Sequence, residues 1–441
     1  MNPRRFWLQL VTWVGVYIAL ILAPLVVAGL GTLPPARGFW IEFGVGLGFV
    51  GLAMLGLQFV LTARFRQIAE PFGTDALLQF HRQAGIVSYW FILGHVIVLL
   101  LADFDNLTFF DPRVNAPRSV ALVTVLILMT LLVVLTLKRE RAGLVYEWWR
   151  LTHGIFALLV VFIGMAHILM VGYYVAPLWK QAIWVVLTLA AMGLLVYVRL
   201  VKPLQALKHP YTLVDIRREA ERTWTLDVKP AGHEGLRFKA GQFAWITFGG
   251  SPFSLEQHPF SFSSSAARNE RLQFTVKELG DFTSEIQRLA PGQRLYLEGP
   301  YGAFTLGEAG SDGALFVAGG IGITPIMSIL RTLRDQQDSR SHTLIYGARR
   351  LEELAFHDEI EQMKAALNLQ VIYVLDEPSE GWVGEQGYVT RELLERVCPT
   401  SLADVEYFVC GPEPMMDLVE TTFRQWGVPL RTLHAERFNI A

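Results

Sequence analysis

Residues 81–101 read HRQAGIVSYWFILGHVIVLLL, an apolar run that begins with a histidine, His81, and carries a second one, His95, further along. The run is long enough to cross a bilayer, which takes about 20 residues of helix. Residues 151–171, LTHGIFALLVVFIGMAHILMV, repeat this layout with His153 and His167. The two stretches therefore predict membrane-spanning helices that each carry two histidines.

More apolar runs of similar length surround these two. Together they predict six spans, at residues 6–30, 40–61, 81–101, 120–137, 151–171 and 179–200. The first run is too long for a removed signal peptide and lacks a small-residue cleavage site. After Lys202, charged residues, Gly-Pro turns and alternating apolar residues take over. The sequence predicts a multidomain membrane protein in which a membrane half precedes a soluble half.

The composition of the 441 residues is consistent with that division. Hydrophobic residues make up 52% and charged residues 18%, whereas a soluble globular chain carries about a quarter charged residues. The net charge of -2 supplies no attraction to polyanions, so we expect no nucleic-acid partner. Cys398 and Cys410 lie outside the apolar half, which excludes a disulfide scaffold, a cysteine-ligated iron–sulfur cluster and covalently attached haem.

Basic residues flank the spans unevenly, and cytoplasmic loops are the ones enriched in lysine and arginine. One set of flanks carries Arg4, Arg5, Arg64, Arg66, Arg82, Lys138, Arg139, Arg141, Arg150, Arg199, Lys202 and Lys208, whereas the other carries Arg37, Arg113, Arg118 and Lys180. The bias predicts a multi-pass protein of the cell inner (plasma) membrane whose N-terminus and soluble half are cytoplasmic. The outer loop carries Asp103, Asp105 and Asp111. These carboxylates either attract a cationic metal complex or are simply solvated.

The four membrane histidines form two pairs with the same spacing. Fourteen residues of helix turn through about 1400°, close to a whole number of turns, and rise about 21 Å. Each helix thus presents one ring near each membrane surface. Because the third and fifth spans run in the same direction, His81 matches His153 in depth on the cytoplasmic side, and His95 matches His167 on the outer side.

Two facing imidazoles at one depth can ligate one haem iron from both sides, so the pattern predicts two haems stacked across the bilayer. Iron ligated in this way has no free position, which favours electron transfer over oxygen binding at the metal. The alternative is a set of ordinary interhelical hydrogen bonds, although polar groups at membrane depth usually have a function.

Short alternating strands between about residues 211 and 304 predict a small antiparallel barrel, with strands at 211–216, 223–228, 243–248, 260–263, 272–276 and 294–298. Within it, His258, Pro259, Phe260 and Ser261 place a ring, an aromatic and a hydroxyl on one segment. Gly280-Asp281-Phe282-Thr283 precedes a predicted helix at 284–289 and is a candidate anion site. The alternatives are an ordinary strand and an ordinary capped helix.

From about residue 314 the pattern changes to strand, glycine loop and helix. A buried strand leads into Gly319-Gly320-Ile321-Gly322-Ile323-Thr324-Pro325 and a helix through about residue 335. This is similar to a dinucleotide-binding loop, with Pro325 in place of the third glycine. Pro suits a first helical turn, and glycines let the backbone approach a pyrophosphate.

Arg349 and Arg350 follow the next strand, at 342–346, where an acidic residue would bind a free ribose 2′-hydroxyl. Two arginines suit a 2′-phosphate, which favours NADPH over NADH unless they merely belong to a solvated turn. Cys410 and Gly411 end a later strand, at the edge of a parallel sheet where ligands bind, although Cys410 can equally be a structural buried thiol. Phe438, near the end of the chain, is placed to cover a flat ring.

These motifs, in this order, resemble those of the ferric reductase / NADPH oxidase superfamily over nearly the full length of the chain. The resemblance implies haem b ligation by His81, His95, His153 and His167. It implies that His258-Pro259-Phe260-Ser261 is an HPF[ST] flavin motif, in which the aromatic and the hydroxyl contact the isoalloxazine and the first residue lies near the FAD phosphates. The remaining cofactor-binding residues that it implies are Gly280 and Thr283 for the FAD pyrophosphate, Gly319, Gly320, Gly322, Thr324 and Pro325 for the nucleotide, Cys410, Gly411 and Pro412 beside the nicotinamide, and Phe438 on the flavin.

We therefore predict three domains: a six-helix transmembrane haem domain at 1–205, an FAD-binding antiparallel β-barrel at 206–308 and a Rossmann-like α/β NAD(P)-binding domain at 309–441. The predicted enzyme moves electrons from cytoplasmic NADPH, or NADH, through FAD and two haem b groups to an outer acceptor. Ser261, Cys410 and Phe438 are its predicted catalytic residues. The acceptor is dioxygen, giving superoxide, or alternatively a ferric or cupric complex.

A different class of function is a haem-containing partner subunit that passes electrons to another protein. The fused nucleotide domain argues against it, because such a subunit needs no dehydrogenase of its own. The sequence shows no segment that demands an obligatory protein partner, and it contains no added calcium-binding or iron–sulfur domain.

Overall fold

The computed structural model describes residues 3–65, 67–68, 73–139, 141–306, 311–398 and 404–437. The chain forms two compact units, and each is described by itself. One comprises residues 7–68 and 76–201, and the other comprises residues 202–440 with the short segments 1–6 and 69–75.

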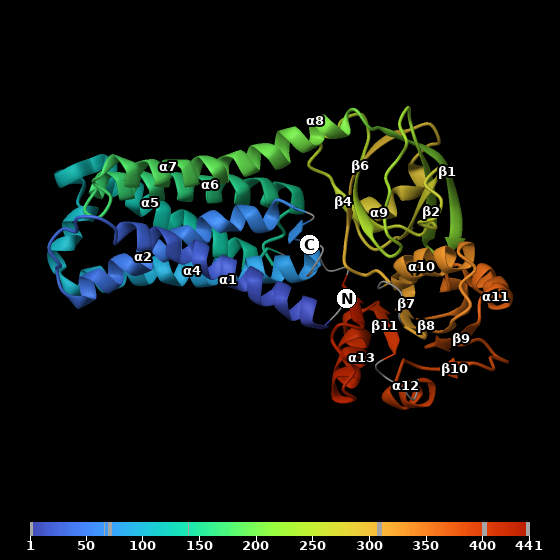
Figure 1. Cartoon of the computed structure of the whole chain (residues 1–441). Coiled ribbons are helices and arrows are strands. Elements are labelled where there is room, and N and C mark those ends of the chain that lie inside the picture. Colours follow the sequence, from blue (N-terminus) through green and yellow to red (C-terminus); the bar gives the residue numbers. More distant parts are fainter. Residues whose placement is uncertain are drawn as a thin grey trace. The chain divides into compact units, whose positions relative to one another are not determined.

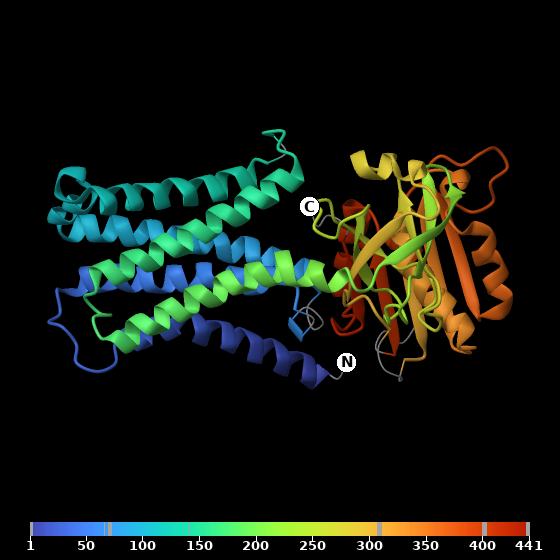
Figure 2. The ribbon, with the colours of Figure 1, turned by 90° about the horizontal axis from the view of Figure 1, so that it is seen from above.

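The first unit is a bundle of long helices that run side by side (Figures 1 and 2). They are α1 (Pro3–Ala28), α2 (Phe39–Thr62), α4 (Thr74–Ala102), α5 (Pro112–Leu137), α6 (Tyr146–Val171) and α7 (Leu178–Val196). Shorter turns connect or follow them, namely η1 (Phe104–Phe110) and the π-helical η2 (Tyr197–Val201), whereas α8 (Lys202–Ala206) belongs to the second unit. Six of the helical stretches are long and apolar enough to cross a membrane, which confirms the predicted spans.

Several of these helices extend beyond the predicted apolar runs. Helix α4 begins at Thr74 rather than at His81, and α6 begins at Tyr146 rather than at Leu151. The difference arises because helical hydrogen bonding continues through polar residues at the membrane surface, which a search for apolar runs leaves out. His81 and His153 consequently lie inside helices instead of at their first turns.

Glycines on α2 allow this helix to approach α4 closely. A Cβ added at Gly44 would lie 3.0 Å from Leu99, one at Gly48 2.7 Å from the His95 ring, and one at Gly51 2.8 Å from Ile92. Small residues let membrane helices pack with their backbones close together, where dispersion contacts replace the missing hydrophobic drive. The glycines of α2 thus set how near its backbone lies to the histidine-bearing helix.

The second unit begins with an antiparallel barrel built from β1 (Tyr211–Ala220), β2 (Thr223–Pro230), β3 (Phe243–Phe248), β4 (His258–Ser261), β5 (Leu272–Lys277) and β6 (Arg294–Tyr301). The strands are ordered β4-β3-β6-β1-β2-β5. The residues after β4 close the sheet, because Phe262 bridges to Phe274 and the Ser263 amide donates to the Gln273 carbonyl at 2.8 Å. The predicted barrel is confirmed.

Two local expectations in the barrel are wrong. The strand expected at 260–263 begins at His258, because Ile246 and Trp245 of β3 pair with His258 and Pro259. The helix expected at 284–289 is instead a single turn, α9 (Asp281–Ser284), followed by the 3₁₀ turn η3 (Ile286–Arg288). A continuous helix gives way here because Ile286 is drawn into the barrel core, where it is fully buried.

The rest of the second unit is a parallel sheet of six strands: β7 (Gly313–Gly319), β8 (Ser341–Ala348), β9 (Leu369–Leu375), β10 (Glu385–Gln386), β11 (Val405–Cys410) and β12 (Leu433–Glu436), ordered β10-β9-β8-β7-β11-β12. Helices α10 (Ile323–Asp335) and α11 (His357–Ala366) cover one face, and α12 (Arg391–Val397) and α13 (Glu413–Gln425) cover the other (Figure 1). This confirms the predicted Rossmann-like fold.

The strand order of this sheet reverses at β7, which pairs with β8 on one side and with β11 on the other. Ligands of such open parallel sheets bind at the carboxyl ends of the strands where the order reverses. The glycine loop after β7 and the Cys410 segment after β11 both lie at this position. The domain boundaries 1–205, 206–308 and 309–441 stay a prediction.

Candidate functional site

The four membrane histidines lie in two facing pairs between α4 and α6. The ring centres of His81 and His153 are 6.3 Å apart with an interplanar angle of 59°, and those of His95 and His167 are 6.5 Å apart at 77°. The structure thus brings together the same partners that the helical spacing predicts. Their role as ligands stays a prediction.

The separations suit a metal centre between the rings. A metal–imidazole bond is about 2 Å long, and two such bonds plus half the width of each ring add up to roughly the separations found. Within the part of the chain that the structure describes, no cluster of three or more His, Cys, Asp or Glu side chains lies close enough to hold a metal ion. A pair of facing histidines is the ligand set that suits a haem iron, because the porphyrin ring itself supplies the other four ligands.

Hydrogen bonds on the far sides of two rings orient them for this role. His95 Nδ1 lies 2.8 Å from the Gly44 carbonyl oxygen, so Nδ1 carries the proton and Nε2 keeps its lone pair for a metal. His153 Nδ1 lies 3.4 Å from the Thr136 hydroxyl, and the His153 ring also contacts the Trp149 ring at 5.2 Å. Among the described residues, the buried Nδ1 of His81 and Nε1 of Trp149 have no hydrogen-bond partner. Polar atoms without partners at the His81–His153 pair are consistent with a bound group that brings its own acceptors.

The charged residues of the loops that are predicted to lie on the outer side have local structural roles. The Asp103 carboxylate accepts the Asp105 amide at the start of η1, and the Asp111 carboxylate accepts the Arg113 amide at the start of α5. The Arg37 guanidinium lies 3.9 Å over the Tyr173 ring, and Arg37 also contacts Glu42 through its side chain and its backbone amide. Helix capping and loop packing therefore explain these residues without an acceptor site.

The predicted flavin segments converge in the barrel. The ring of His258, on β4, stacks on that of Phe282, on α9, with centres 4.0 Å apart at an angle of 13°. The Thr283 hydroxyl accepts the amides of Leu279 and Gly280, both at 2.9 Å, and so shapes the turn before α9. The Ser261 hydroxyl is buried and has no hydrogen-bond partner among the described residues. A buried hydroxyl of this kind fits the edge of a bound flavin, which offers acceptors.

Phe282 is a site residue that sequence reasoning missed. It lies within the Gly280–Thr283 turn, which was assigned to pyrophosphate, and nothing in the motif itself shows that its ring faces His258. The ring also lies 6.4 Å from Phe260 and 5.1 Å from Phe248. The available signal was an aromatic in a loop that precedes a short helix, which is too common a pattern to point to a site.

The predicted nucleotide loops lie against each other so closely that side chains are excluded. A Cβ added at Gly322 would fall 2.1 Å from the Cys410 carbonyl oxygen, one at Gly319 2.6 Å from Pro412, and one at Gly411 2.9 Å from the Gly319 Cα. Gly320 has φ +52°, in the left-handed region that glycine tolerates. These residues form one backbone surface at the carboxyl ends of β7 and β11.

The start of α10 completes this surface. Thr324 lies in its first turn and its hydroxyl donates to the Ile321 carbonyl at 2.9 Å, and Pro325 is buried beside it. The free backbone N–H groups at a helix N-terminus favour an anion, so this end of α10 suits a pyrophosphate. Cys410 is fully buried at the end of β11.

Glu436 is a second residue that sequence reasoning missed. It pairs in register with Cys410 across β11 and β12, and a Cβ added at Gly302 after β6 would lie 3.1 Å from its Oε1. A buried carboxylate thus stands between the barrel and the nucleotide domain. Only the parallel pairing of β12 with β11 brings it there. Phe438 lies outside the described residues, and Arg437 before it pairs with Asp417 at 2.7 Å.

Arg349 and Arg350 follow β8 as predicted, but each is paired with a carboxylate. Arg349 contacts Glu377 at 2.7 Å, and Arg350 contacts Glu221 at 2.9 Å. The hydrogen bond from Arg349 lowers the pKa of Glu377 below its ordinary value, so this carboxylate is charged at neutral pH. A nucleotide 2′-phosphate would have to share Arg349 with a negative charge.

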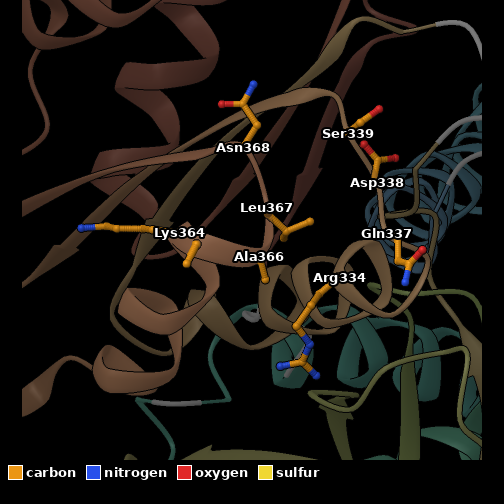
Figure 3. A pocket seen from close by; sticks show the side chains of 9 residues that line it. Arg334, Gln337, Asp338, Ser339, Lys364, Ala366, Leu367 and Asn368 are labelled. Carbon is orange, nitrogen blue, oxygen red and sulfur yellow. The ribbon is translucent and has the colours of Figure 1, made fainter.

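A surface cavity of about 740 Å³ lies elsewhere on the nucleotide domain. Its lining comes from the end of α10, the end of α11 and the segments that precede β8 and β9 (Figure 3), so it lies at the amino-terminal edge of the sheet. The side chains of Arg334 and Lys364 diverge rather than point at a common centre. In the same cavity, hydrogen bonding by Arg340 lowers the pKa of Asp338 to about 2. This cavity is separate from the nucleotide site.

Three family models match successive parts of the chain, in the same order as the histidine pairs, the flavin segments and the nucleotide loops. A ferric reductase like transmembrane component matches residues 47–164, an FAD-binding domain matches 220–305, and an oxidoreductase NAD-binding domain matches 316–421.

Curated relatives match about half of the chain. The reductase component of propane 2-monooxygenase from Mycolicibacterium smegmatis is 31% identical over 202 residues, which is 44% of this chain and 57% of that protein. A probable dihydroorotate dehydrogenase B (NAD(+)) electron transfer subunit from Methanopyrus kandleri is 32% identical over 222 residues, or 50% of this chain and 76% of that protein. The chain spans little more than half the length of the first of these.

Among solved structures, a flavohemoglobin from Malassezia yamatoensis with bound FAD and heme has a TM-score of 0.50 at 16% identity, over 90% of this chain and 96% of that one. At this identity the likeness shows the fold alone.

The fold and the matched models define a class: a membrane-spanning oxidoreductase with FAD-binding and NAD-binding domains. Within that class, the ferric-reductase-like membrane part followed by the two nucleotide-binding domains gives the family. The chain belongs to the ferric reductase / NADPH oxidase superfamily.

The close approach of Gly322 to Cys410 yields a prediction. Gly322→Ala places a methyl group 2.1 Å from a backbone oxygen, so the two loops must separate. We expect NAD(P)H-dependent flavin reduction to slow by about 100-fold, because a misplacement of about 1 Å at a reacting centre costs that much. Stopped-flow absorbance of the flavin measures the rate. Gly250→Ala, where a Cβ meets nothing within 4 Å, is the control, and equal rates in both variants would contradict the prediction.

Proposed function

We propose that this protein carries electrons from cytoplasmic NAD(P)H through FAD and two haem b groups to an acceptor at the outer face of the plasma membrane. The observation that carries the proposal is the pair of facing histidine couples, with ring separations of 6.3 Å and 6.5 Å, one toward each end of α4 and α6. Together with the FAD-binding and NAD-binding domains, they supply a donor site and a path.

The nucleotide would lie on the backbone surface of the two glycine loops. Gly319, Gly320 and Gly322 admit the pyrophosphate, and the N-terminus of α10 favours its charge. Cys410, Gly411 and Pro412 would border the nicotinamide, since they end the neighbouring strand. Glu436, beside Cys410, adds a buried carboxylate to the same edge.

The flavin would be held by β4 and by the turn before α9. The Ser261 hydroxyl, which has no partner among the described residues, is available to donate to the ring. Gly280 and Thr283, in the turn before α9, are proposed to hold the FAD pyrophosphate, with His258 and Phe282 stacked nearby. Bound FAD would supply the conversion from a two-electron hydride donor to single-electron transfers, and Phe438 is proposed to cover its ring.

The membrane histidines would hold one haem per pair. His81 and His153 take the cytoplasmic-side haem, and His95 and His167 take the outer one. Two histidines for each iron would leave it no free position, which would suit electron transfer. The Gly44 carbonyl fixes the tautomer of His95, so that Nε2 would be the atom that holds the iron.

We propose dioxygen as the acceptor, with superoxide as the product. The outer-loop carboxylates of Asp103 and Asp111 are already used as helix caps, so local structure explains them without a cationic metal complex. Reduction of a ferric or cupric chelate is the second candidate, because the membrane part matches a ferric reductase like component. Transfer to another protein, with this chain as a partner subunit, is the third.

The proposal is tested on the purified full-length protein supplied with FAD and haem. NADPH or NADH should bleach the flavin and then shift the haem absorbance. Cytochrome c reduction that superoxide dismutase suppresses identifies dioxygen as the acceptor, whereas reduction of ferric chelate that the dismutase leaves unchanged identifies the metal complex. A protein without Soret absorbance after expression with ample haem would overturn the membrane path.

Removing one histidine of the inner pair should cost one haem. We expect His153→Leu to retain about half of the haem of the parent protein while flavin reduction by NAD(P)H proceeds at the parent rate. The pyridine haemochrome assay gives the haem content and stopped-flow absorbance gives the flavin rate. His357→Leu in the nucleotide domain removes a histidine of neither pair and serves as the control. Retention of both haems in His153→Leu rules out the assignment.

Gly48 offers a subtler probe of the outer pair. A Cβ at this position would lie 2.7 Å from His95 Nδ1, so Gly48→Ala must rotate the ring away from the Gly44 carbonyl. We expect altered electron paramagnetic resonance g-values or loss of the outer haem. Gly56→Ala on the same helix meets nothing within 4 Å and should leave the spectrum unchanged. An unaltered spectrum in Gly48→Ala speaks against ligation by His95.

The pairing of Arg349 with Glu377 bears on the choice of nucleotide. Glu377→Gln removes the charge that competes with a 2′-phosphate for Arg349, so we expect the KM for NADPH to fall several-fold relative to that for NADH. Steady-state kinetics with both nucleotides measure the ratio. Glu380→Gln makes the same change of charge nearby in the sequence as a control. An equal shift in both variants would reflect bulk charge alone and would refute a specific role for Glu377.

A further inference from the structure

One face of α10 is devoted to polar contacts with the barrel. The helix starts at the nucleotide loop, and the contacting side chains recur at helical spacing, so they form a single stripe along it. Their partners lie in the barrel segment between the end of β4 and the end of β5. The stripe comprises Thr324, Ser328, Arg331, Thr332 and Asp335.

Three members of the stripe each contact one residue of the barrel. The Ser328 hydroxyl donates to the Ser264 carbonyl at 2.7 Å, and the Thr332 hydroxyl accepts the Ala266 amide at 2.9 Å. Asp335 pairs with Arg268 at 3.0 Å. Each of these contacts joins the nucleotide domain to the barrel at one place, and the Asp335–Arg268 pair lies at the surface.

Arg331 makes several contacts at once and is nearly inaccessible, with a side chain 7% exposed. Its Nη1 donates to the Ser263 carbonyl at 2.6 Å and to the Gln273 side-chain oxygen at 3.0 Å. Its Nε and Nη2 donate to the two oxygens of Glu359 on α11. One rigid guanidinium therefore ties α10 both to the barrel and to a second helix of its own domain.

The Glu359 carboxylate compensates the charge of the buried Arg331 guanidinium. Burial pushes the pKa of Glu359 upward, but hydrogen bonds and charge from Arg331 outweigh that effect and hold the pKa below its ordinary value. The pair is thus ionised on both sides, and a charge-assisted bidentate contact is stronger than a neutral one. Removing either partner would leave a buried charge uncompensated.

The contacts of Arg331 connect the two reacting sites by a short route. Ser263 lies two residues after Ser261, the hydroxyl assigned to the flavin, and α10 begins directly after Gly322 in the nucleotide loop. A change in how Arg331 binds Ser263 would therefore move the flavin strand relative to the nucleotide loop. Few residues lie between, so little of the displacement could be absorbed.

We propose that Arg331 is a positioning residue that sets the nicotinamide against the flavin, so that hydride donor and acceptor are at reacting distance without a domain movement. The inference rests on the proposed first step, hydride transfer from NAD(P)H to FAD. That transfer breaks the C4–H bond of the dihydronicotinamide and forms an N–H bond at flavin N5. Both electrons move with the hydrogen, the nicotinamide is oxidised and the flavin is reduced.

The chain offers a matched control for Arg331. Arg334, one turn further along α10, also contacts Glu359, at 3.2 Å, and pairs with Asp335, but every contact recorded for it lies within the nucleotide domain. Arg331→Met and Arg334→Met therefore remove the same charge and a contact to the same carboxylate. Only the first removes a contact to the barrel.

The experiment follows anaerobic flavin reduction in the full-length protein by stopped-flow absorbance, with NADH or NADPH and with each nucleotide deuterated at C4. In Arg331→Met we expect the limiting rate of reduction to fall by about 10- to 100-fold, while the nucleotide Kd stays within about twofold. The deuterium isotope effect should become more dependent on temperature, since the donor–acceptor distance is no longer fixed. Arg334→Met should keep both the parent rate and the parent isotope effect.

Two further variants grade the effect. Arg331→Lys keeps the positive charge but lacks the several N–H donors of the guanidinium, so it should recover the rate of flavin reduction only in part. Gln273→Met removes one acceptor and leaves the Ser263 contact intact. Gln273→Met should give a smaller loss of rate with the same change in the isotope effect. This variant replaces Arg331→Met as the test if Arg331→Met does not retain FAD.

Each remaining outcome decides the matter. A parent rate and isotope effect in Arg331→Met overturn the proposal. So does a loss of rate that merely parallels lost FAD while the isotope effect is unchanged in both Arg331→Met and Gln273→Met, because that indicates stability alone. A parent protein whose flavin neither nucleotide reduces overturns the proposed function itself, and the positioning role with it.

Discussion

Facing imidazoles between α4 and α6 are the constraint on which the membrane unit depends. A polar ring nitrogen in hydrocarbon is costly unless it is bonded, and here each ring meets another across a similar gap. The glycines of α2 follow from this constraint, because Gly44 supplies a carbonyl to His95 and Gly48 leaves room for its ring. Lipid-facing positions on the same helices have no polar atoms that need partners, and they are simply apolar.

The second unit depends on a different constraint. In it, two loops and two domains must approach each other closely. Gly319, Gly322 and Gly411 remove side chains where the loops meet, so that backbone N–H groups can face a nucleotide. The polar stripe on α10 then fixes these loops to the barrel. Apolar packing fills each domain and also joins them, since Phe304 after β6 packs on Phe408 of the nucleotide domain, and directional hydrogen bonds from α10 add fixed contacts to the barrel. Directional bonds suit this purpose because they tolerate little sliding.

Much of the site follows from residue patterns with a physical cause. The spacing of His81 from His95 places both rings on one helix face, and the glycines of the nucleotide loop reveal a close approach of backbone. The helix expected at 284–289 failed because burial of Ile286 in the barrel outweighs the local preference for a continuous helix. Phe282, Glu436 and Arg331 carry no local signal, since a single aromatic, acid or arginine is common in any chain.

The sequence by itself determined the membrane spans, the pairing of the four membrane histidines, the order of the domains and the close approach of the glycine loops. It could do so because each of these depends on periodicity or on the steric demand of one residue. Only the tertiary structure decided that Arg349 pairs with Glu377, that Glu436 lies beside Cys410 and that Arg331 binds the Ser263 carbonyl just after β4. Those contacts join residues far apart along the chain, and their energies arise when separate elements pack together.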